Sequence, residues 1–108
     1  MTLPRLKETL ALTAFALPQE ERDVRGGYVG DLLSWVMGRA EADAAWLTIM
    51  SNPNIVAVAA LTDVSCVILC EGVVPDAGVA SLALEKGVNL LGSEKSAFEL
   101  AASISKLL

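Results

Sequence analysis

Histidine is absent from the sequence, and cysteine occurs only twice, at Cys66 and Cys70. Without histidine, the chain lacks the most frequent general base and the commonest metal ligand. A zinc site would then need more sulfur or carboxylate ligands than two cysteines four residues apart supply. Within a strand these cysteines would lie about 13 Å apart on one face, too far for a disulfide. We therefore expect no metal, no cofactor and two buried structural thiols in a reducing cytoplasm.

Charge is also scarce, since charged residues make up 19% of the chain, and 13 acidic against 8 basic residues leave a net charge of −5. This balance repels a phosphate backbone, so no nucleic-acid partner is expected. No apolar run approaches the roughly 18 residues of a membrane helix. Leu10–Leu17 follows Arg5 and Lys7 in the manner of a secretion signal, but Glu8 interrupts the basic region, so we expect a cytoplasmic protein with no membrane partner.

Motifs for phosphate binding and catalysis are missing as well. The stretch DVRGGYVGDLLS, which starts at Asp23, fits neither GxxxxGK[ST] nor GxGxxG. Arg25, Gly26 and Gly27 are candidate ligand contacts, although Arg25 could equally form a salt bridge to Asp23 or Asp31 while the glycines bend a strand. No serine or cysteine has an activating base near it in sequence. We therefore predict that the chain is not an enzyme, and a site with paired carboxylates is the weakest of three hypotheses.

Apolar residues, by contrast, make up 54% of the 108 residues. A chain of this length forms a single domain, residues 1–108, and can bury a core without disulfides. The apolar content exceeds what one small core requires. Part of it is expected to face a partner, most simply a second copy in a homodimer.

Hydrophobic periodicity and turn residues predict an α/β three-layer sandwich with a mainly parallel sheet. Thr2, Asp31, Ser51 or Asn52, Asp76, and Ser96 with Glu99 are predicted helix caps, and Gly87 a left-handed helix stop. The expected helices are 3–12, 31–40, 53–62, 76–87 and 96–108, and the expected strands are 12–17, 24–30 (bent), 45–50, 65–70 and 88–92.

The apolar run at residues 55–61 fits either a buried strand or a buried helix. A helix is favoured because Thr62-Asp63 lacks the glycine or asparagine of a tight hairpin, and because the strands on either side are apolar on both faces, as in parallel sheets. A helix that is apolar on all sides would pack on the sheet and on a partner. We therefore predict a homodimer interface at Trp35, Ile55, Val58 and Ala59.

Three loops follow the expected parallel strands and lead into helices. Ligands of open α/β sheets bind beyond the carboxyl ends of the strands, where helix N-termini attract anions. The loops therefore predict a site for a nucleotide or another anionic metabolite, and the alternative is that their polar residues simply cap helices. The candidate residues are Ser51, Asn52, Asn54, Gly72 and Ser93.

Several segments together resemble the DRTGG domain family. Asp23-Val24-Arg25-Gly26-Gly27 has the form DxxGG and is followed by GYVGDLLSWVM, WLTI, NPNIVAVAAL and SAFELAASISKLL, in the order of that family. Val24 and Arg25 depart from the name-giving motif. The resemblance implies the fold of the N-terminal domain of HPr kinase/phosphorylase.

The resemblance also implies a role. DRTGG domains occur beside CBS domains in pyrophosphatases and within phosphotransacetylases as regulatory or dimerising modules, and some stand-alone copies are associated with iron-only hydrogenases. By this resemblance the chain is a regulatory or scaffolding module attached to a metabolic or hydrogenase-related system, with a further protein as a partner. A small-ligand sensor is the alternative.

Overall fold

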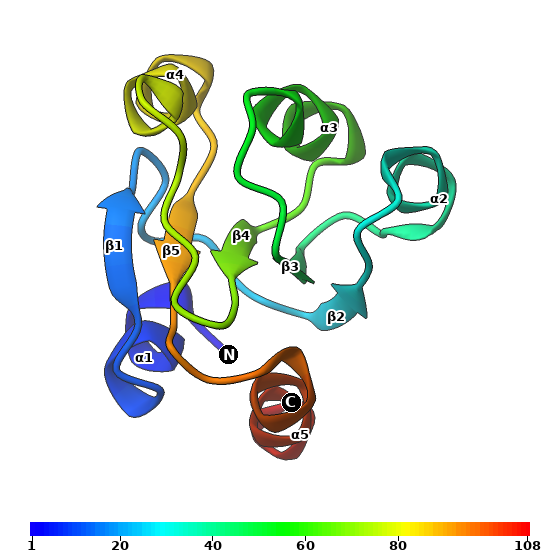
Figure 1. Ribbon diagram of the computed structural model, residues 1–108. Helices are drawn as coiled ribbons and strands as arrows, with labels where there is room; N and C mark the ends of the chain where they lie inside the picture. Colours follow the sequence, from blue (N-terminus) through cyan, green and yellow to red (C-terminus); the bar gives the residue numbers. More distant parts are fainter.

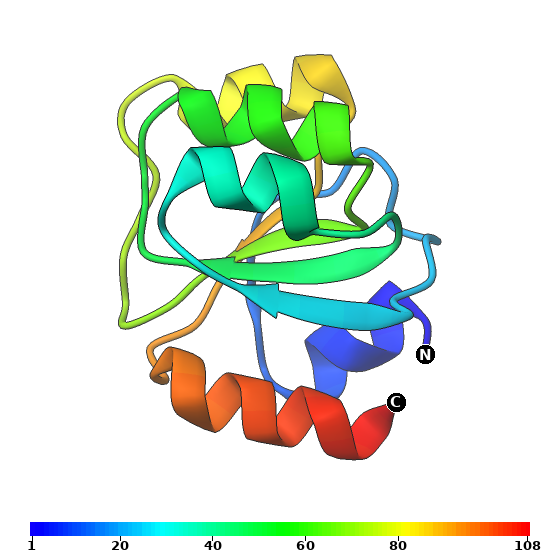
Figure 2. The ribbon, with the colours of Figure 1, turned by 90° about the vertical axis from the view of Figure 1, so that its right-hand side faces the viewer.

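The computed structural model describes residues 1–108 and shows one five-stranded sheet between two layers of helices (Figure 1). The elements are α1 (Leu3–Thr9), β1 (Thr13–Ala16), β2 (Gly26–Val29), α2 (Leu33–Arg39), β3 (Ala44–Thr48), α3 (Asn54–Thr62), β4 (Cys66–Leu69), α4 (Val79–Lys86), β5 (Leu90–Gly92) and α5 (Ala97–Leu107). Helices α2, α3 and α4 cover one face of the sheet, and α1 and α5 cover the other (Figures 1 and 2). The predicted three-layer α/β sandwich is confirmed.

The strand order is β1-β5-β4-β3-β2. All neighbouring strands pair in parallel except β1, which pairs antiparallel with β5. The pairing of β1 shifts register between Ala14 and Ala16, whereas β2 pairs with β3 in unbroken register from Gly26 to Val29. Gly26 and Gly27 do not have positive φ angles, so β2 does not use the conformational freedom for which the two glycines were expected to bend it.

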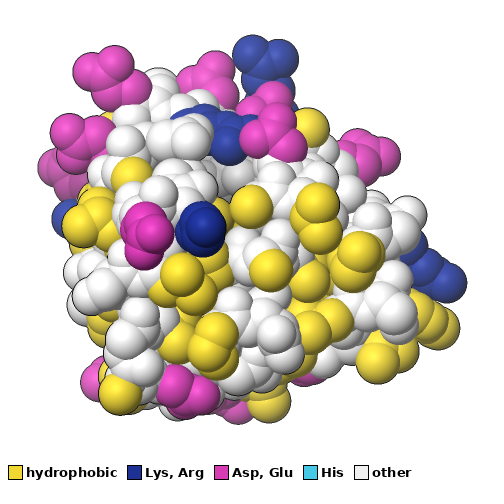
Figure 3. Space-filling model, turned by 90° about the horizontal axis from the view of Figure 1, so that it is seen from above, with side chains coloured by type: hydrophobic (Ala, Val, Ile, Leu, Met, Phe, Trp, Pro, Cys, Tyr) yellow, Lys and Arg dark blue, Asp and Glu magenta, His cyan; other side chains and the backbone are white.

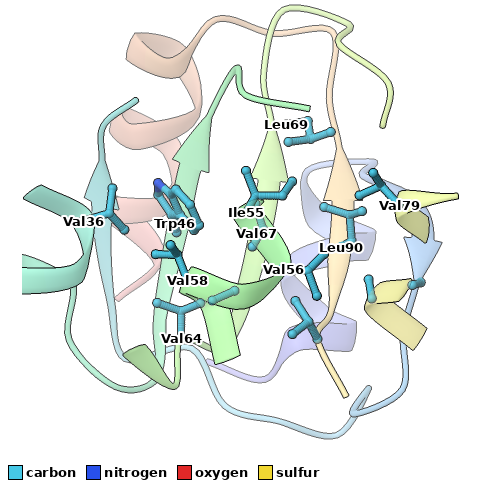
Figure 4. Close-up of a cluster of buried hydrophobic side chains, with 14 of the residues drawn as sticks. Val36, Trp46, Ile55, Val56, Val58, Val64, Val67, Leu69, Val79 and Leu90 are labelled. Carbon is cyan, nitrogen blue, oxygen red and sulfur yellow. The ribbon is translucent and has the colours of Figure 1, made fainter. Parts of the chain in front are cut away.

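The first core lies between the sheet and helices α2 to α4 (Figure 4). Trp46 of β3 is fully buried there, and its Nε1 donates a hydrogen bond to the Gly30 carbonyl at 2.9 Å. The predicted helix over 55–61 is confirmed, and its Ile55, Val58 and Ala59 point into this core. Because these three side chains are buried within the chain, they cannot contact a second copy, and their assignment to an interface is wrong.

The second core lies between the sheet and helices α1 and α5. The predicted leucine stripe at the start of the chain is buried in it, together with Leu100 and Ile104 of α5. Cys66 and Cys70 share this face as predicted and are free thiols. Leu108 was also expected in the buried stripe, but it is 50% exposed because α5 ends at Leu107.

The predicted helix caps and stops are observed at some positions and not at others. Ser96 Oγ accepts a hydrogen bond from the Glu99 backbone N–H at 3.2 Å, and Gly87 ends α4 with a φ of 74°, so both predictions are confirmed. Thr2 makes no side-chain cap bond. Asp31 and Asp76, which were predicted caps, make other contacts instead, because each has a hydroxyl partner on a neighbouring loop or strand.

Candidate functional site

The sheet separates the predicted ligand residues into two groups. Arg25, Gly26 and Gly27 lie at the amino end of β2, while Ser51, Asn52, Asn54, Gly72 and Ser93 follow the carboxyl ends of β3, β4 and β5. In a parallel sheet the amino ends of the strands lie along one side and the carboxyl ends along the opposite side. We call these two sides the amino edge and the carboxyl edge, as distinct from the edge strands β1 and β2. One ligand of ordinary size therefore contacts one group or the other.

At the carboxyl edge, hydrogen bonds join the loops that follow the strands. Ser51 Oγ donates to Asp76 Oδ1 at 2.7 Å, and the Asp76 backbone N–H donates back to the Ser51 carbonyl at 3.0 Å. The Gly72 N–H donates to the Ser93 carbonyl at 2.9 Å. Asn52 Oδ1 accepts from the Asn54 N–H at 2.9 Å, which caps the start of α3. The predicted residues thus come together, mainly through bonds to one another.

Asp31 belongs to this edge, although the sequence suggested a helix cap or a salt-bridge partner of Arg25. Its Oδ1 accepts hydrogen bonds from Thr48 Oγ1 at 2.7 Å and from the Ile49 N–H at 2.9 Å. Thr48 is itself buried at the end of β3. The Asp31 carboxylate therefore fixes the end of β2 against the end of β3, and its Oδ2 takes no part in these bonds.

The charge of the carboxyl edge opposes an anion. Asp31, Glu71, Asp76 and Glu94 are all exposed there, against the single cation of Lys95. Like charges repel, and helix N-termini contribute only partial positive charges. No group of three or more His, Cys, Asp or Glu residues is placed to hold a metal ion.

A hollow of about 360 Å³ opens at the amino edge of the sheet, where β2 begins and α2 ends. Arg39 lies over the Trp35 ring, 3.8 Å from its centroid, and Arg25 makes only a long 3.6 Å ion pair with Asp23. The lining of the hollow thus contains two guanidinium groups and the one carboxylate of Glu41, while Asp23, outside the lining, pairs with Arg25. Its lining residues are Arg25, Gly26, Gly27, Tyr28, Arg39, Glu41, Ala42 and Ala44.

Two apolar surfaces are exposed on the molecule. The first, the helical face, is the outward side of α2 to α4 with Met37, Leu61 and Leu84; Figure 3 shows apolar side chains spread over it, with charged groups mostly along its margin. The second is a groove of about 220 Å³ between β2 and α5. It is lined by Gly27, Tyr28, Val29, Leu47, Ala101, Ile104, Ser105 and Leu108.

The two thiols are poor nucleophiles. Burial raises the pKa of Cys66 to about 12, although the positive charge of Arg22 opposes this increase. Burial also raises the pKa of Cys70 to about 11, while a backbone hydrogen bond at Thr48 lowers it and the charges of Asp31 and Glu71 raise it further. Both thiols are therefore protonated at neutral pH.

Comparison with known proteins places the fold. No family model and no curated protein matches the sequence. A solved structure of the CBS and DRTGG domains of the regulatory region of Clostridium perfringens pyrophosphatase, complexed with its activator diadenosine tetraphosphate, matches the chain with a TM-score of 0.79. The chain has a DRTGG-like fold. The sequence identity is 17%, and the match covers 99% of this chain.

The DRTGG-like fold accounts for about half of that solved region, since the match covers 47% of its length. The resemblance noted from the sequence segments is thereby supported at the level of the fold. None of the helices has both the length and the apolar content needed to cross a membrane.

Proposed function

We propose that the chain is a non-catalytic regulatory or scaffolding module of the cytoplasm, which forms a homodimer and binds a further protein of a metabolic or hydrogenase-related system. The observation that carries this proposal is the presence of two separate apolar surfaces, the helical face and the β2 groove. A small protein that exposes two such surfaces can contact two partners at once. The likeness to a regulatory region of another protein supports the same role.

The helical face is suited to protein recognition because its central helix carries no charge. Helix α3 has the sequence NIVAVAALT, and Leu61 near its end is 72% exposed. Met37 of α2 and Leu84 of α4 are exposed on the neighbouring helices. We assign this face to the further protein.

A photoreactive amino acid at position 61 tests this assignment in the cell that makes the protein, with position 106 on α5 as the matched control. Both positions are exposed, but they lie on opposite layers. Cross-links to a second protein are expected at position 61 and not at position 106. Equal cross-linking at both positions, or none at 61, contradicts a partner on the helical face.

Sedimentation equilibrium tests the homodimer. The purified chain, measured from micromolar to millimolar concentration, is expected to change from one-chain to two-chain mass. A single one-chain species at all concentrations removes the homodimer from the proposal. It leaves the assignment of the helical face to another protein intact, since the cross-linking experiment tests that assignment separately.

The second candidate function is that of a nucleotide or anion sensor. The hollow with Arg25 and Arg39 favours it, because two guanidinium groups suit phosphate oxygens. The solved pyrophosphatase region, which holds diadenosine tetraphosphate, is consistent with it. We place this site at the amino end of β2, away from the acidic loops of the carboxyl edge.

Thermal unfolding with added nucleotides tests the sensor. A ligand at about 100 times its dissociation constant adds roughly 2.7 kcal/mol, which raises the midpoint of a domain of this size by about ten degrees. Replacing Arg25 and Arg39 together by glutamine should abolish the shift, while the exposed Arg5→Gln control keeps it. A shift that survives the double replacement moves the site elsewhere.

A further inference from the structure

The free edge of β2 has the features of a pairing surface. Strand β2 is the last in the sheet and pairs only with β3. We propose that this edge pairs antiparallel with β2 of a second copy, in a register centred on Tyr28. This inference rests on the homodimer of the proposed function and names its interface.

The two edge strands of the sheet, β1 and β2, differ in how well they are protected from pairing with a strand of another chain. Natural edge strands are guarded by charges, proline or bulges. The β1 edge has such an irregularity, since its register shifts between Ala14 and Ala16. The β2 edge, with the sequence GGYV, has neither charge nor proline and keeps unbroken register. Figure 2 shows β2 in front, with no segment crossing it.

The proposed register makes the strand complementary to itself. Centring on Tyr28 places the two Tyr28 residues opposite one another, which is a favourable aromatic cross-strand pair. Val29 then lies opposite the partner's Gly27. Both Val29 and Gly27 line the apolar groove, so each exposed valine covers the space that the missing glycine side chain leaves.

The charges at the two ends of the strand agree with the same register. Arg25 falls opposite the partner's Asp31, and symmetry repeats the pair. Arg25 is free for this contact, because its side chain is 71% exposed and its ion pair with Asp23 is long. Asp31 uses only Oδ1 for its bonds to Thr48 and Ile49, which leaves Oδ2 for the partner's Arg25.

An aromatic residue beside the edge extends the contact. Arg39, which stacks on Trp35, lines the same hollow as Gly26 and Gly27 at the start of β2. Trp35 is half-exposed, so it remains available to a second copy, unlike the buried residues of α3.

Charge exchange tests the register. Sedimentation equilibrium compares the original chain with R25E, D31K and the double variant, and R5E is the matched control with the same change of charge. Each single variant should weaken the dimer about tenfold or more, while the double variant should return to within about threefold of the original. The R5E control should dissociate like the original chain.

Other results would overturn the proposal. Unchanged dimers in both single variants, or a double variant as weak as each single one, exclude the Arg25 pair. A dimer that dissociates with L61E but not with R25E keeps the homodimer and moves its interface to the helical face. If the original chain never dimerises, the homodimer itself is wrong.

Amide hydrogen exchange of the original chain gives a second measurement, which stays valid if D31K fails to fold. The amides of β2 should become protected as the protein concentration rises through the dimer range. A dimer that forms without this protection excludes pairing at the β2 edge.

Discussion

Asn89 holds both backbone groups of Gln19, a residue 70 positions earlier in the chain. The Gln19 N–H donates to Asn89 Oδ1 at 2.9 Å, and Asn89 Nδ2 donates to the Gln19 carbonyl, also at 2.9 Å. The same Nδ2 donates to the Ser65 carbonyl at 2.9 Å. One buried amide thus joins the connector after β1 to the starts of β4 and β5.

Replacing Asn89 should therefore destabilise the fold. The side chain is only 2% exposed, so Asn89→Leu leaves the buried Ser65 carbonyl and the part-buried backbone groups of Gln19 without their partners. We expect a loss of about 3 kcal/mol in the free energy of unfolding in urea. Asn54→Ala, at an exposed position, should change it by less than about 0.5 kcal/mol. A loss as small as that of the control contradicts the role of Asn89.

Arg22 should be needed for the loops that precede β3 and β4. Its Nη2 lies 3.1 Å from Asp43 Oδ1 and 2.8 Å from Asp63 Oδ1, and its side chain is 18% exposed. We expect Arg22→Ala to cost about 2 kcal/mol of stability, and Arg22→Lys to recover less than half, because lysine lacks the guanidinium fork. The exposed Arg5→Ala is the control. Full recovery by lysine would show that charge alone suffices.

Replacement by alanine should change the stability of the fold in opposite directions at two glycines, Gly92 and Gly38. A Cβ at Gly92 would lie 2.6 Å from Phe15 Cε2, whereas a Cβ at Gly38 in α2 meets nothing within 4 Å. We expect Gly92→Ala to destabilise by about 1–2 kcal/mol, and Gly38→Ala to stabilise by about 0.5–1 kcal/mol. In a Phe15→Ala background, Gly92→Ala should cost little; an undiminished cost there means that Phe15 is not the obstacle.

Alkaline pH should weaken the fold through the thiols. Burial raises the pKa of Cys66 from 9.0 to about 12, so between these values the folded chain keeps a proton that the unfolded chain has lost. The contribution of Cys66 to the free energy of unfolding is therefore fully present below about pH 9 and is lost as the pH rises toward 12. Urea midpoints should fall less between about pH 8 and pH 10.5 in Cys66→Ala than in the original chain. Equal falls would exclude a contribution from Cys66.

The three-layer arrangement could be predicted from the sequence, because hydrophobic periodicity and turn residues determine which segments form helices and which form strands. Thr62-Asp63 lacks the glycine or asparagine of a tight hairpin, and the strands on either side are apolar on both faces; together these patterns distinguished a crossover helix from a strand at 55–61. The same run is apolar on every side, so its periodicity could not show which residues face the sheet, and its Ile55, Val58 and Ala59 were wrongly assigned to an interface.

The site was less predictable, because it depends on contacts between distant segments. Asp31 and Asp76 resemble helix caps in sequence, and nothing local reveals the hydroxyl groups of Thr48 and Ser51. One signal was present but unused. Arg25 lies near the start of its predicted strand, 24–30, whereas Ser51 follows the strand 45–50, which already places the two residues at opposite ends of the strands of a parallel sheet.

The register shift in β1 has a consequence for how far the protein can aggregate. A sheet with regular edges on both sides can add chains without limit and grow into fibrils. Here the irregular pairing at Ala14 and Ala16 leaves β1 a poor template. In the proposed dimer the β2 edge of each copy is occupied by the other, and the irregular β1 edge is the one left free. If the proposed β2 pairing forms, growth of the sheet is therefore expected to stop at two chains, which would keep so apolar a protein from polymerising.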